Sequence, residues 1–158
     1  MNYFRIIKRE HSQTPFGYGS LAGRWNQRNV PMIYASSSVA LAMTEYLSIK
    51  GTQVLNTEWS LITYSIDRYV PELERENLPV EWDSRPYSLT TQLFGSQWIR
   101  SQASVCLKVP SARLLLSAYP IEHNLLMNPF HPDLFTIVNV IRTEDLHFHL
   151  NEWATGDR

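Results

Sequence analysis

The chain has 158 residues, 44% of them hydrophobic, and a formal net charge of −1. These totals fit one globular domain over residues 1–158 and exclude a disordered chain. Nucleic-acid binders usually carry a basic excess that neutralises phosphates, so the charge argues against direct contact with DNA or RNA. A small anionic ligand held by one or two arginines stays compatible with it.

Targeting and metal-binding signals are missing from the sequence. The N-terminus lacks the apolar core of a signal peptide, and no apolar run reaches the roughly 20 residues that span a bilayer. We therefore expect a cytoplasmic protein without membrane contact. The one cysteine, Cys106, lies in an apolar run, which predicts a buried strand thiol. The histidines show no dependable ligand spacing, so we expect no metal site.

The first half of the chain predicts two short strands, a helix and a longer strand. Residues 3–7 favour a strand, and prolines and glycines indicate a long loop over residues 13–29. Residues 31–35 favour a buried strand, after Asn29 at a left-handed turn position. Three serines at 36–38 offer N-caps for a helix over residues 39–48. Residues 59–66 alternate in the manner of a strand.

The second half predicts one more helix among short strands. Residues 71–86 contain charges and three prolines, which indicates an irregular excursion. A helix is expected over residues 88–102 with Ser88 as its cap. Strands are expected at 104–109, 113–116, 125–127 and 135–141, with an edge strand at 146–150. Regular βαβ alternation is missing, so we predict an α+β fold rather than a doubly wound sheet.

The sequence motifs of P-loop ATPases, Rossmann folds, zinc proteases and α/β-hydrolases are missing. One short stretch nevertheless contains several residue types that are suited to ligand binding or catalysis. Arg24 lies on a glycine-bearing loop, Tyr34 ends a strand, and Glu45 lies on the next helix. A loop arginine can grip a phosphate, and a tyrosine ring can face a flat heterocycle. By residue type alone, each also has a purely structural explanation as a surface, half-buried or solvated side chain.

Several segments, in order along nearly the whole chain, resemble the RES domain family, which is named for an arginine, a glutamate and a serine. They are Gly23-Arg24-Trp25-Asn26, Pro31-Met32-Ile33-Tyr34-Ala35-Ser36, Ala40-Leu41-Ala42-Met43-Thr44-Glu45, Gly95-Ser96-Gln97-Trp98-Ile99, Val109-Pro110-Ser111-Ala112 and the block over residues 122–132. Ala22, Asn29 and Ser96 depart from the usual glycine, glycine and aspartate.

The resemblance implies a fold similar to ADP-ribosyltransferase toxins: α+β, with a split β-sheet core and flanking helices around an NAD cleft. It implies NAD as substrate and these catalytic residues: Arg24, Tyr34, Glu45 and Ser111. It also implies these NAD-binding residues: Arg24, Asn26, Tyr34, Ser36, Asn128 and His131. Since Asn128 and His131 each precede a proline, a structural turn explains them equally well.

The family's chemistry suits the residue types carried over. Nicotinamide leaves NAD as a neutral group, so no general acid is needed, while the ribose develops oxocarbenium character. Glu45 would stabilise that charge, and Arg24 would grip the diphosphate. Tyr34 would wall in the nicotinamide or its ribose. Ser111 would hold a ribose hydroxyl or orient Glu45.

The resemblance implies a bacterial toxin whose antitoxin is an Xre-like helix-turn-helix protein, with a homodimer inside the larger complex. The expected activity is cleavage of the nicotinamide–ribose bond by water or phosphate, which depletes cellular NAD. Three alternatives stay open: ADP-ribose transfer to a protein, a non-catalytic antitoxin-binding protein, and an RNA-cleaving toxin. The −1 charge and the scattered histidines weigh against the last.

Overall fold

An antiparallel six-stranded sheet in the order β4-β5-β2-β1-β3-β6 organises the chain. The structure is a computed structural model, and it describes residues 1–151. The elements are β1 (Asn2–Lys8), η1 (Arg9–His11), β2 (Ile33–Ser36), α1 (Val39–Lys50), η2 (Gly51–Asn56), β3 (Trp59–Ile66), η3 (Arg75–Asn77), α2 (Leu89–Ser101), β4 (Cys106–Val109), η4 (Leu116–Ala118), β5 (Asn124–Met127), α3 (Leu134–Ile137) and β6 (Val138–Leu146).

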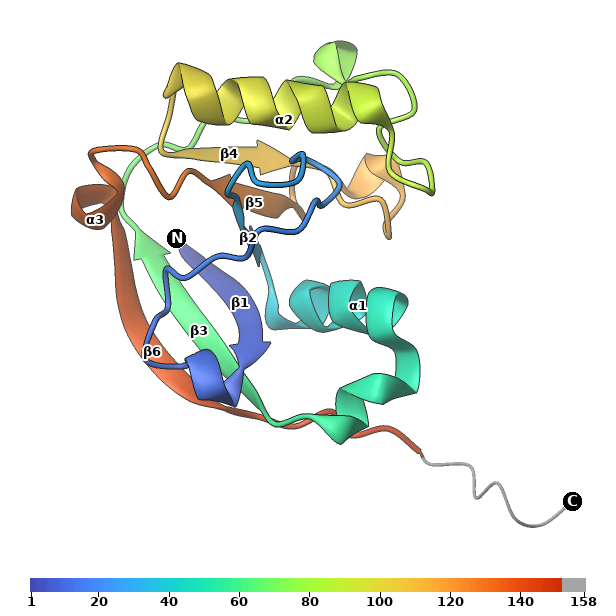
Figure 1. Cartoon of the computed structure of the whole chain (residues 1–158), viewed down its shortest axis with the longest axis vertical. Coiled ribbons are helices and arrows are strands. Elements are labelled where there is room, and N and C mark those ends of the chain that lie inside the picture. The colour runs from blue at the N-terminus through green and yellow to red at the C-terminus, as the bar shows by residue number, and fades with distance from the viewer. Residues whose placement is uncertain (152–158) are drawn as a thin grey trace, which may run out of the picture.

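The sheet is split between β2 and β1. These two strands share a single residue pair, Phe4 opposite Ser36, whereas β1 pairs with β3 along its whole length. The strands β4, β5 and β2 therefore form one half and β1, β3 and β6 the other, and the two halves run in different directions in Figure 1. The predicted α+β fold with a split sheet and flanking helices is confirmed.

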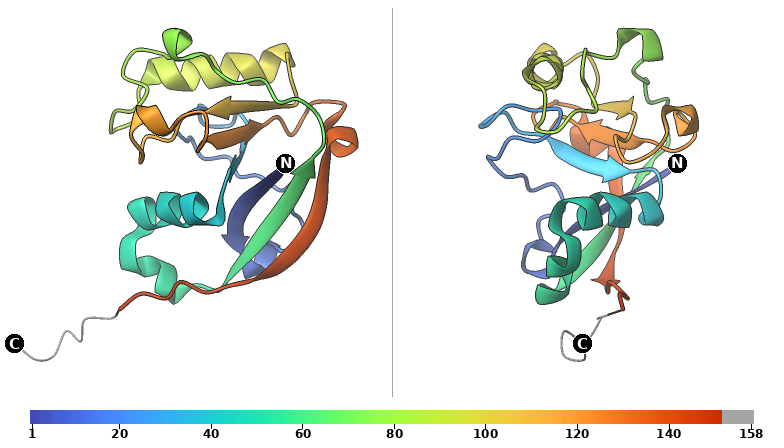
Figure 2. Two further views of the ribbon diagram at one scale, coloured as in Figure 1. Left: turned by 180° about the vertical axis from the view of Figure 1, so that it is seen from behind. Right: turned by 90° about the vertical axis from the view of Figure 1, so that its right-hand side faces the viewer.

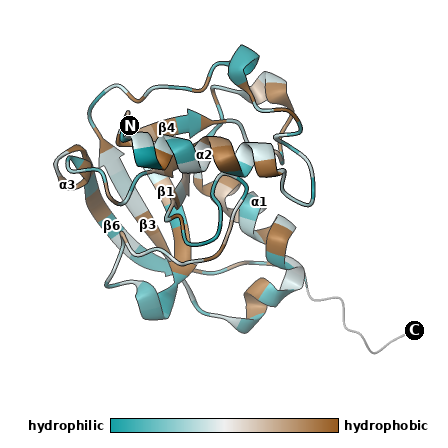
Figure 3. Ribbon diagram, turned by 45° about the horizontal axis from the view of Figure 1, so that its top comes forward, coloured by the Kyte–Doolittle hydropathy of each residue, from teal (hydrophilic) through white to brown (hydrophobic). Residues whose placement is uncertain are grey.

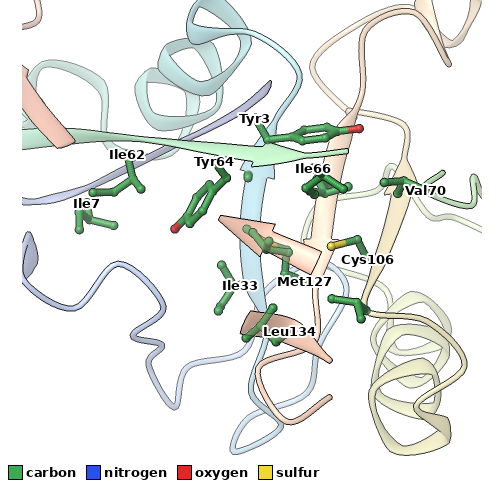
Figure 4. Close-up of a cluster of buried hydrophobic side chains, with 14 residues drawn as sticks. Tyr3, Ile7, Ile33, Ile62, Tyr64, Ile66, Val70, Cys106, Met127 and Leu134 are labelled. Carbon is green, nitrogen blue, oxygen red and sulfur yellow. The ribbon is translucent and has the colours of Figure 1, made fainter. Parts of the chain in front are cut away.

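Both halves contribute side chains to the main hydrophobic core (Figure 4), which includes Tyr3, Ile62 and Tyr64 from one half and Ile33 and Met127 from the other. The helix α2 lies along the β4–β5 half (Figure 2). Its residues Trp98 and Ile99 share a second core cluster with residues of β4 and β5. Figure 3 shows hydrophobic and hydrophilic residues alternating along α2, as expected for a helix with one face on a sheet.

Local signals are confirmed at several element ends. The Ser38 hydroxyl accepts a hydrogen bond from the Leu41 backbone N–H and caps α1. Asn29 has φ 64°, in the left-handed region. Ser88 precedes α2 as expected, but its hydroxyl caps no backbone N–H of the helix and instead shares a hydrogen bond with the Thr90 hydroxyl at 2.6 Å. The Cys106 thiol is buried in β4, and burial raises its pKa to about 12.

Three predicted strands are wrong in whole or in part. Residues 113–115 form a turn that leads into η4, which begins at Leu116, and none of the described strands pairs with them; Leu115 is exposed to solvent. Residues 135–137 belong to α3, where the Ile137 N–H donates to the Asp133 carbonyl; β6 begins only at Val138. Residues 147–150 continue past β6 without ladder pairing, and Phe148 packs its ring against Trp59.

No helix within residues 1–151 combines the length and the apolar character that crossing a membrane requires.

Candidate active site

A cavity of about 400 Å³ opens where α1 faces β1, β2 and the loop before β2. Four parts of the chain line it. Strand β1 contributes Phe4, Arg5 and Ile6, and helix α1 contributes Ala42, Glu45, Tyr46, Ile49 and Lys50. The loop before β2 and β2 itself contribute Ala22, Gly23, Arg24, Trp25, Met32, Tyr34, Ala35 and Ser36. The fourth part is a set of residues from later segments: Tyr87, Arg113 and Asn124. Arg24, Tyr34, Ser36 and Glu45 are thereby brought together, as the sequence predicts.

One side, which we call the arginine wall, is built by residues 22–27 and Tyr34; residues 22–25 and Tyr34 line the cavity, and residues 26–27 support them from outside the lining. The Tyr34 hydroxyl donates to Asn26 Oδ1 and accepts from the Trp25 N–H at 3.1 Å. Burial raises the pKa of Tyr34 above its ordinary range. A Cβ at Gly23 would lie 2.6 Å from the Tyr34 hydroxyl oxygen, so only glycine lets the loop approach this closely.

Helix α2 holds the arginine wall from behind. Gln92 Nε2 donates to the Gly23 carbonyl at 3.0 Å, and the Gln27 N–H donates to Ser96 Oγ at 3.0 Å. An aspartate at position 96 could accept the same bond, which explains why serine is tolerated there. A Cβ at Gly95 would lie 1.7 Å from the Trp25 carbonyl oxygen. The loop therefore rests directly on the helix backbone.

Arg24 is held partly by carbonyl groups. Its Nη1 donates to the carbonyls of Trp82 and Ser84 at 2.8 and 2.9 Å, and its guanidinium lies 4.8 Å from the centroid of the Tyr87 ring. Burial lowers the pKa of Arg24, and the charges of Tyr87 and Glu45 oppose that shift. An arginine stays cationic in proteins, so the wall presents a positive charge of fixed orientation to the cavity.

The opposite side, the carboxylate wall, is built by Glu45 and Asn124, which line the cavity, and by Ser111, which is buried and bonds Glu45 from outside the lining. Glu45 Oε1 accepts hydrogen bonds from Ser111 Oγ at 2.6 Å and from Asn124 Nδ2 at 2.7 Å. Short bonds to an ionised acceptor are the strong ones. The Ser111 hydroxyl in turn accepts from the Arg113 N–H at 3.1 Å. The Glu45 side chain is 23% exposed, so it is held and still reachable from the cavity.

The matches with known proteins cover the same stretch of chain. The sequence matches the RES domain over residues 2–151. The chain belongs to the RES domain family.

Curated relatives of this RES domain carry toxin names. "Toxin Res" of Yersinia enterocolitica serotype O:8 is 35% identical over 147 residues, which cover 90% of this chain and 93% of that protein. "Toxin Res" of Photorhabdus laumondii is 32% identical and covers 92% of each. "Prs ADP-ribosylating toxin" of a Sphingobium species is 39% identical over 115 residues, which cover 70% of this chain and 68% of that protein.

A solved structure shares the fold. The Mycobacterium tuberculosis MbcT–MbcA toxin–antitoxin complex contains a chain that superposes with a TM-score of 0.69 at 17% sequence identity. The superposition covers 92% of this RES domain and 83% of the other chain. The split sheet with flanking helices is therefore an arrangement seen in an experimental structure.

Three residues predicted to bind NAD lie outside the cavity lining. Asn26 is buried, and its amide donates to three carbonyls of its own loop. Asn128 is buried and bonds the Ile99 carbonyl and the Phe130 N–H. His131 Nδ1 accepts from the Asp133 N–H. These bonds fit the turn-forming alternative for residues 128–131, and we leave all three residues out of the proposed site.

Sequence reasoning missed two residues that touch Glu45. Asn124 lies in the segment that resembles the family's closing block. Its contact with Glu45 could not be predicted, because the sequence does not show that Asn124 on β5 pairs with Ser36 on β2. Arg113 follows Ser111 by two residues, and its Nε lies 3.8 Å from Glu45 Oε2. Tyr87, whose ring lies against the Arg24 guanidinium, had no sequence signal, because it falls between the irregular residues 71–86 and the predicted helix over residues 88–102.

Within residues 1–151, no three His, Cys, Asp or Glu side chains gather where they could hold a metal ion. Among the residues that line the cavity are one carboxylate, Glu45, together with arginine and aromatic side chains.

Proposed function

We propose that this RES domain is a bacterial cytoplasmic toxin that cleaves NAD at the nicotinamide–ribose bond. The observation that carries the proposal is the Glu45 carboxylate, held by Ser111 and Asn124 in a cavity that also contains Arg24. The toxin names of the relatives support the biological role.

The electrostatics of the cavity suit the proposed bond cleavage. The electron pair of the C1′–N bond leaves with nicotinamide, which turns from a cation into a neutral molecule, and positive charge moves to the ribose. A carboxylate close to that ribose stabilises the charge as it forms. Water or phosphate then forms the new C1′–O bond, with loss of a proton when water attacks.

The remaining groups are suited to other parts of the substrate. Arg24 is suited to the NAD diphosphate, because a guanidinium pairs with phosphate oxygens. The Tyr34 ring walls the cavity, while its hydroxyl is engaged by the loop, so a contact through the ring face is expected. A cavity of about 400 Å³ lies within the range of ligand pockets. The proposed reaction needs no metal.

Transfer of ADP-ribose to a protein is a second candidate, favoured by the relative named "Prs ADP-ribosylating toxin". The same carboxylate would stabilise the same charge, and a side chain of the target would replace water. A third candidate, a non-catalytic antitoxin-binding protein, offers no reason for a carboxylate held so firmly in a cavity.

We also propose an antitoxin partner, since a chain of the same fold was solved in a toxin–antitoxin complex. An Xre-like helix-turn-helix antitoxin and a homodimer are the forms that the family resemblance implies.

The test is nicotinamide release from NAD by purified protein, compared between wild type, Glu45→Gln and the control Glu76→Gln. Glu76 is an exposed glutamate in η3, outside the cavity lining. Removing one group that stabilises transition-state charge costs about 100- to 1000-fold in rate, so we expect a loss of that size in Glu45→Gln and none in Glu76→Gln.

Adenylate-labelled NAD separates the candidates. Free label supports cleavage by water or phosphate, and label on a protein from added cell extract supports transfer. Full activity in Glu45→Gln would remove Glu45 from the mechanism. If wild type releases no nicotinamide even with extract, the enzymatic proposals fail and the non-catalytic role stands.

A further inference from the structure

The two oxygens of the Glu45 carboxylate have different surroundings. Oε1 accepts the hydrogen bonds from Ser111 and Asn124. Oε2 has the Arg113 Nε at 3.8 Å, which is too long for a hydrogen bond. One oxygen is therefore immobilised by the protein, and the other has acceptor capacity left for a ligand.

Asn124 is itself oriented by Ser36. The two residues lie directly opposite each other on β5 and β2, and the Ser36 hydroxyl donates to Asn124 Oδ1 at 2.8 Å. With its carbonyl oxygen occupied by Ser36, the amide turns its NH₂ group toward Glu45. Ser36 is only 4% exposed, so the bond is shielded from water.

Ser36 also marks the joint of the split sheet, because it is the β2 residue that pairs with Phe4 of β1. The chain of bonds from Ser36 through Asn124 to Glu45 thus connects this joint with helix α1. Ser111, beyond β4, reaches the same oxygen from another segment. The carboxylate is fixed by three parts of the fold that are distant in sequence.

We propose that Ser36 and Asn124 are positioning residues that fix Glu45 through Oε1 and leave Oε2 as the oxygen that meets the substrate ribose. This inference rests on the proposed function. It gives Ser36, which the family resemblance implies as an NAD-binding residue, a role through Asn124 instead, because its hydroxyl donates to Asn124 Oδ1.

A positioning role predicts a particular kinetic signature. Small displacements of a catalytic group cost about 100-fold in rate, and loss of an outer partner costs about 10- to 100-fold. Both residues line the cavity, but their polar groups bind each other and Glu45, so we expect the loss to fall on kcat while KM changes little.

The experiment compares Asn124→Ala, Ser36→Ala and Ser36→Thr with wild type and with the control Ser60→Ala. Ser60 is an equally buried strand serine outside the cavity lining. We expect kcat to fall about 10- to 100-fold in Asn124→Ala and about 10-fold in Ser36→Ala. Ser36→Thr keeps the hydroxyl and recovers most of the activity, and Ser60→Ala behaves as wild type.

A second readout does not depend on turnover. In ¹⁵N-NMR spectra, the Asn124 side-chain amide proton that faces Glu45 should lie downfield in wild type and shift upfield in Glu45→Ala and in Ser36→Ala, but not in Ser60→Ala. An unchanged amide signal overturns the positioning arrangement even if the protein never consumes NAD.

The kinetic outcomes separate the two proposals. If the wild-type protein does not turn over NAD, the proposed function is contradicted but the positioning arrangement is not. If the wild-type protein turns over NAD and the folded Asn124→Ala variant has an unchanged kcat, the positioning role is contradicted but the proposed function is not. A rise in KM at constant kcat in Ser36→Ala would return Ser36 to direct substrate binding and overturn the inference.

Discussion

The arginine wall and the carboxylate wall each contain one asparagine, and the two asparagines bind very different partners. Asn26 donates to carbonyls of its own loop and accepts from Tyr34, so its hydrogen bonds shape the backbone that presents Arg24. Asn124 donates to the Glu45 carboxylate and accepts from Ser36. Residue type alone therefore does not separate an asparagine that folds a loop from one that holds a reactive charge.

The walls also differ in what backs them. The arginine wall rests on α2 through close backbone contact at Gly95, and the carboxylate wall rests on side-chain hydrogen bonds from β5 and the segment after β4. Changes on the first wall should act mainly on stability, and changes on the second mainly on turnover.

The largest expected stability effect is that of Gly95→Ala. In a solvent-exposed helix this change stabilises, because alanine is the better helix former. Here the new Cβ would overlap the Trp25 carbonyl, 1.7 Å away, so the loop and α2 must separate. We expect a loss of about 3 kcal/mol in the free energy of unfolding, measured by urea denaturation. The exposed helix position Gln97→Ala is the control, and equal stability of the two variants would contradict the contact.

Tyr34→Phe tests the arginine wall at a single hydrogen-bonding group. Removing the hydroxyl leaves both Asn26 Oδ1 and the Trp25 N–H without this partner, in residues that are 3% and 2% exposed. An orphaned buried polar group costs about 1–3 kcal/mol, so we expect a loss of about 2 kcal/mol in unfolding free energy.

The matched control for Tyr34→Phe is Tyr46→Phe, which removes one bond to the Ile6 carbonyl on the other side of the cavity. The Tyr34 variant should lose more stability than the Tyr46 variant in the same denaturation assay. The reverse order would mean that the Tyr34 hydroxyl does not organise the loop.

The smallest expected effect concerns acid stability behind the carboxylate wall. His123 is 1% exposed and precedes Asn124; its backbone N–H donates to Ser37 Oγ, and its carbonyl accepts from the Ser37 N–H. Burial lowers the pKa of His123, so the unfolded chain binds a proton more readily than the folded one. The stability that comes from neutral His123 is thus present above about pH 6.5 and is lost as pH falls below it.

We expect the unfolding free energy to fall by up to about 1.4 kcal/mol per pH unit below pH 6.5 from this residue. Urea denaturation of wild type, His123→Asn and the control His131→Asn at pH 7.5 and 5.5 measures it. The His123 variant should show a flatter dependence on pH, and the His131 variant should follow wild type. An unchanged slope in His123→Asn would assign the acid sensitivity elsewhere.

The sequence by itself determined the features that depend on neighbouring residues. Ser38 and the apolar run after it specify the start of α1, because a cap and its helix lie within one turn. Asn29 tolerates the left-handed turn at its position. The order of Arg24, Tyr34 and Glu45 along one loop, strand and helix brought these residues to one cavity, and the family resemblance added Ser111.

Only the tertiary structure decided the features that depend on pairing between residues distant in sequence. Residues 113–116 and 147–150 have strand-like composition, but no neighbouring strand pairs with them, and a strand needs a partner for its backbone hydrogen bonds. The pairing of β5 with β2 placed Asn124 opposite Ser36 and beside Glu45, across 88 and 79 residues of chain. Such contacts leave no periodic pattern in the sequence, because the chain between the two partners can be of any composition. The family resemblance in the sequence therefore singled out Glu45 as the candidate carboxylate, and its supports became visible only in the folded sheet.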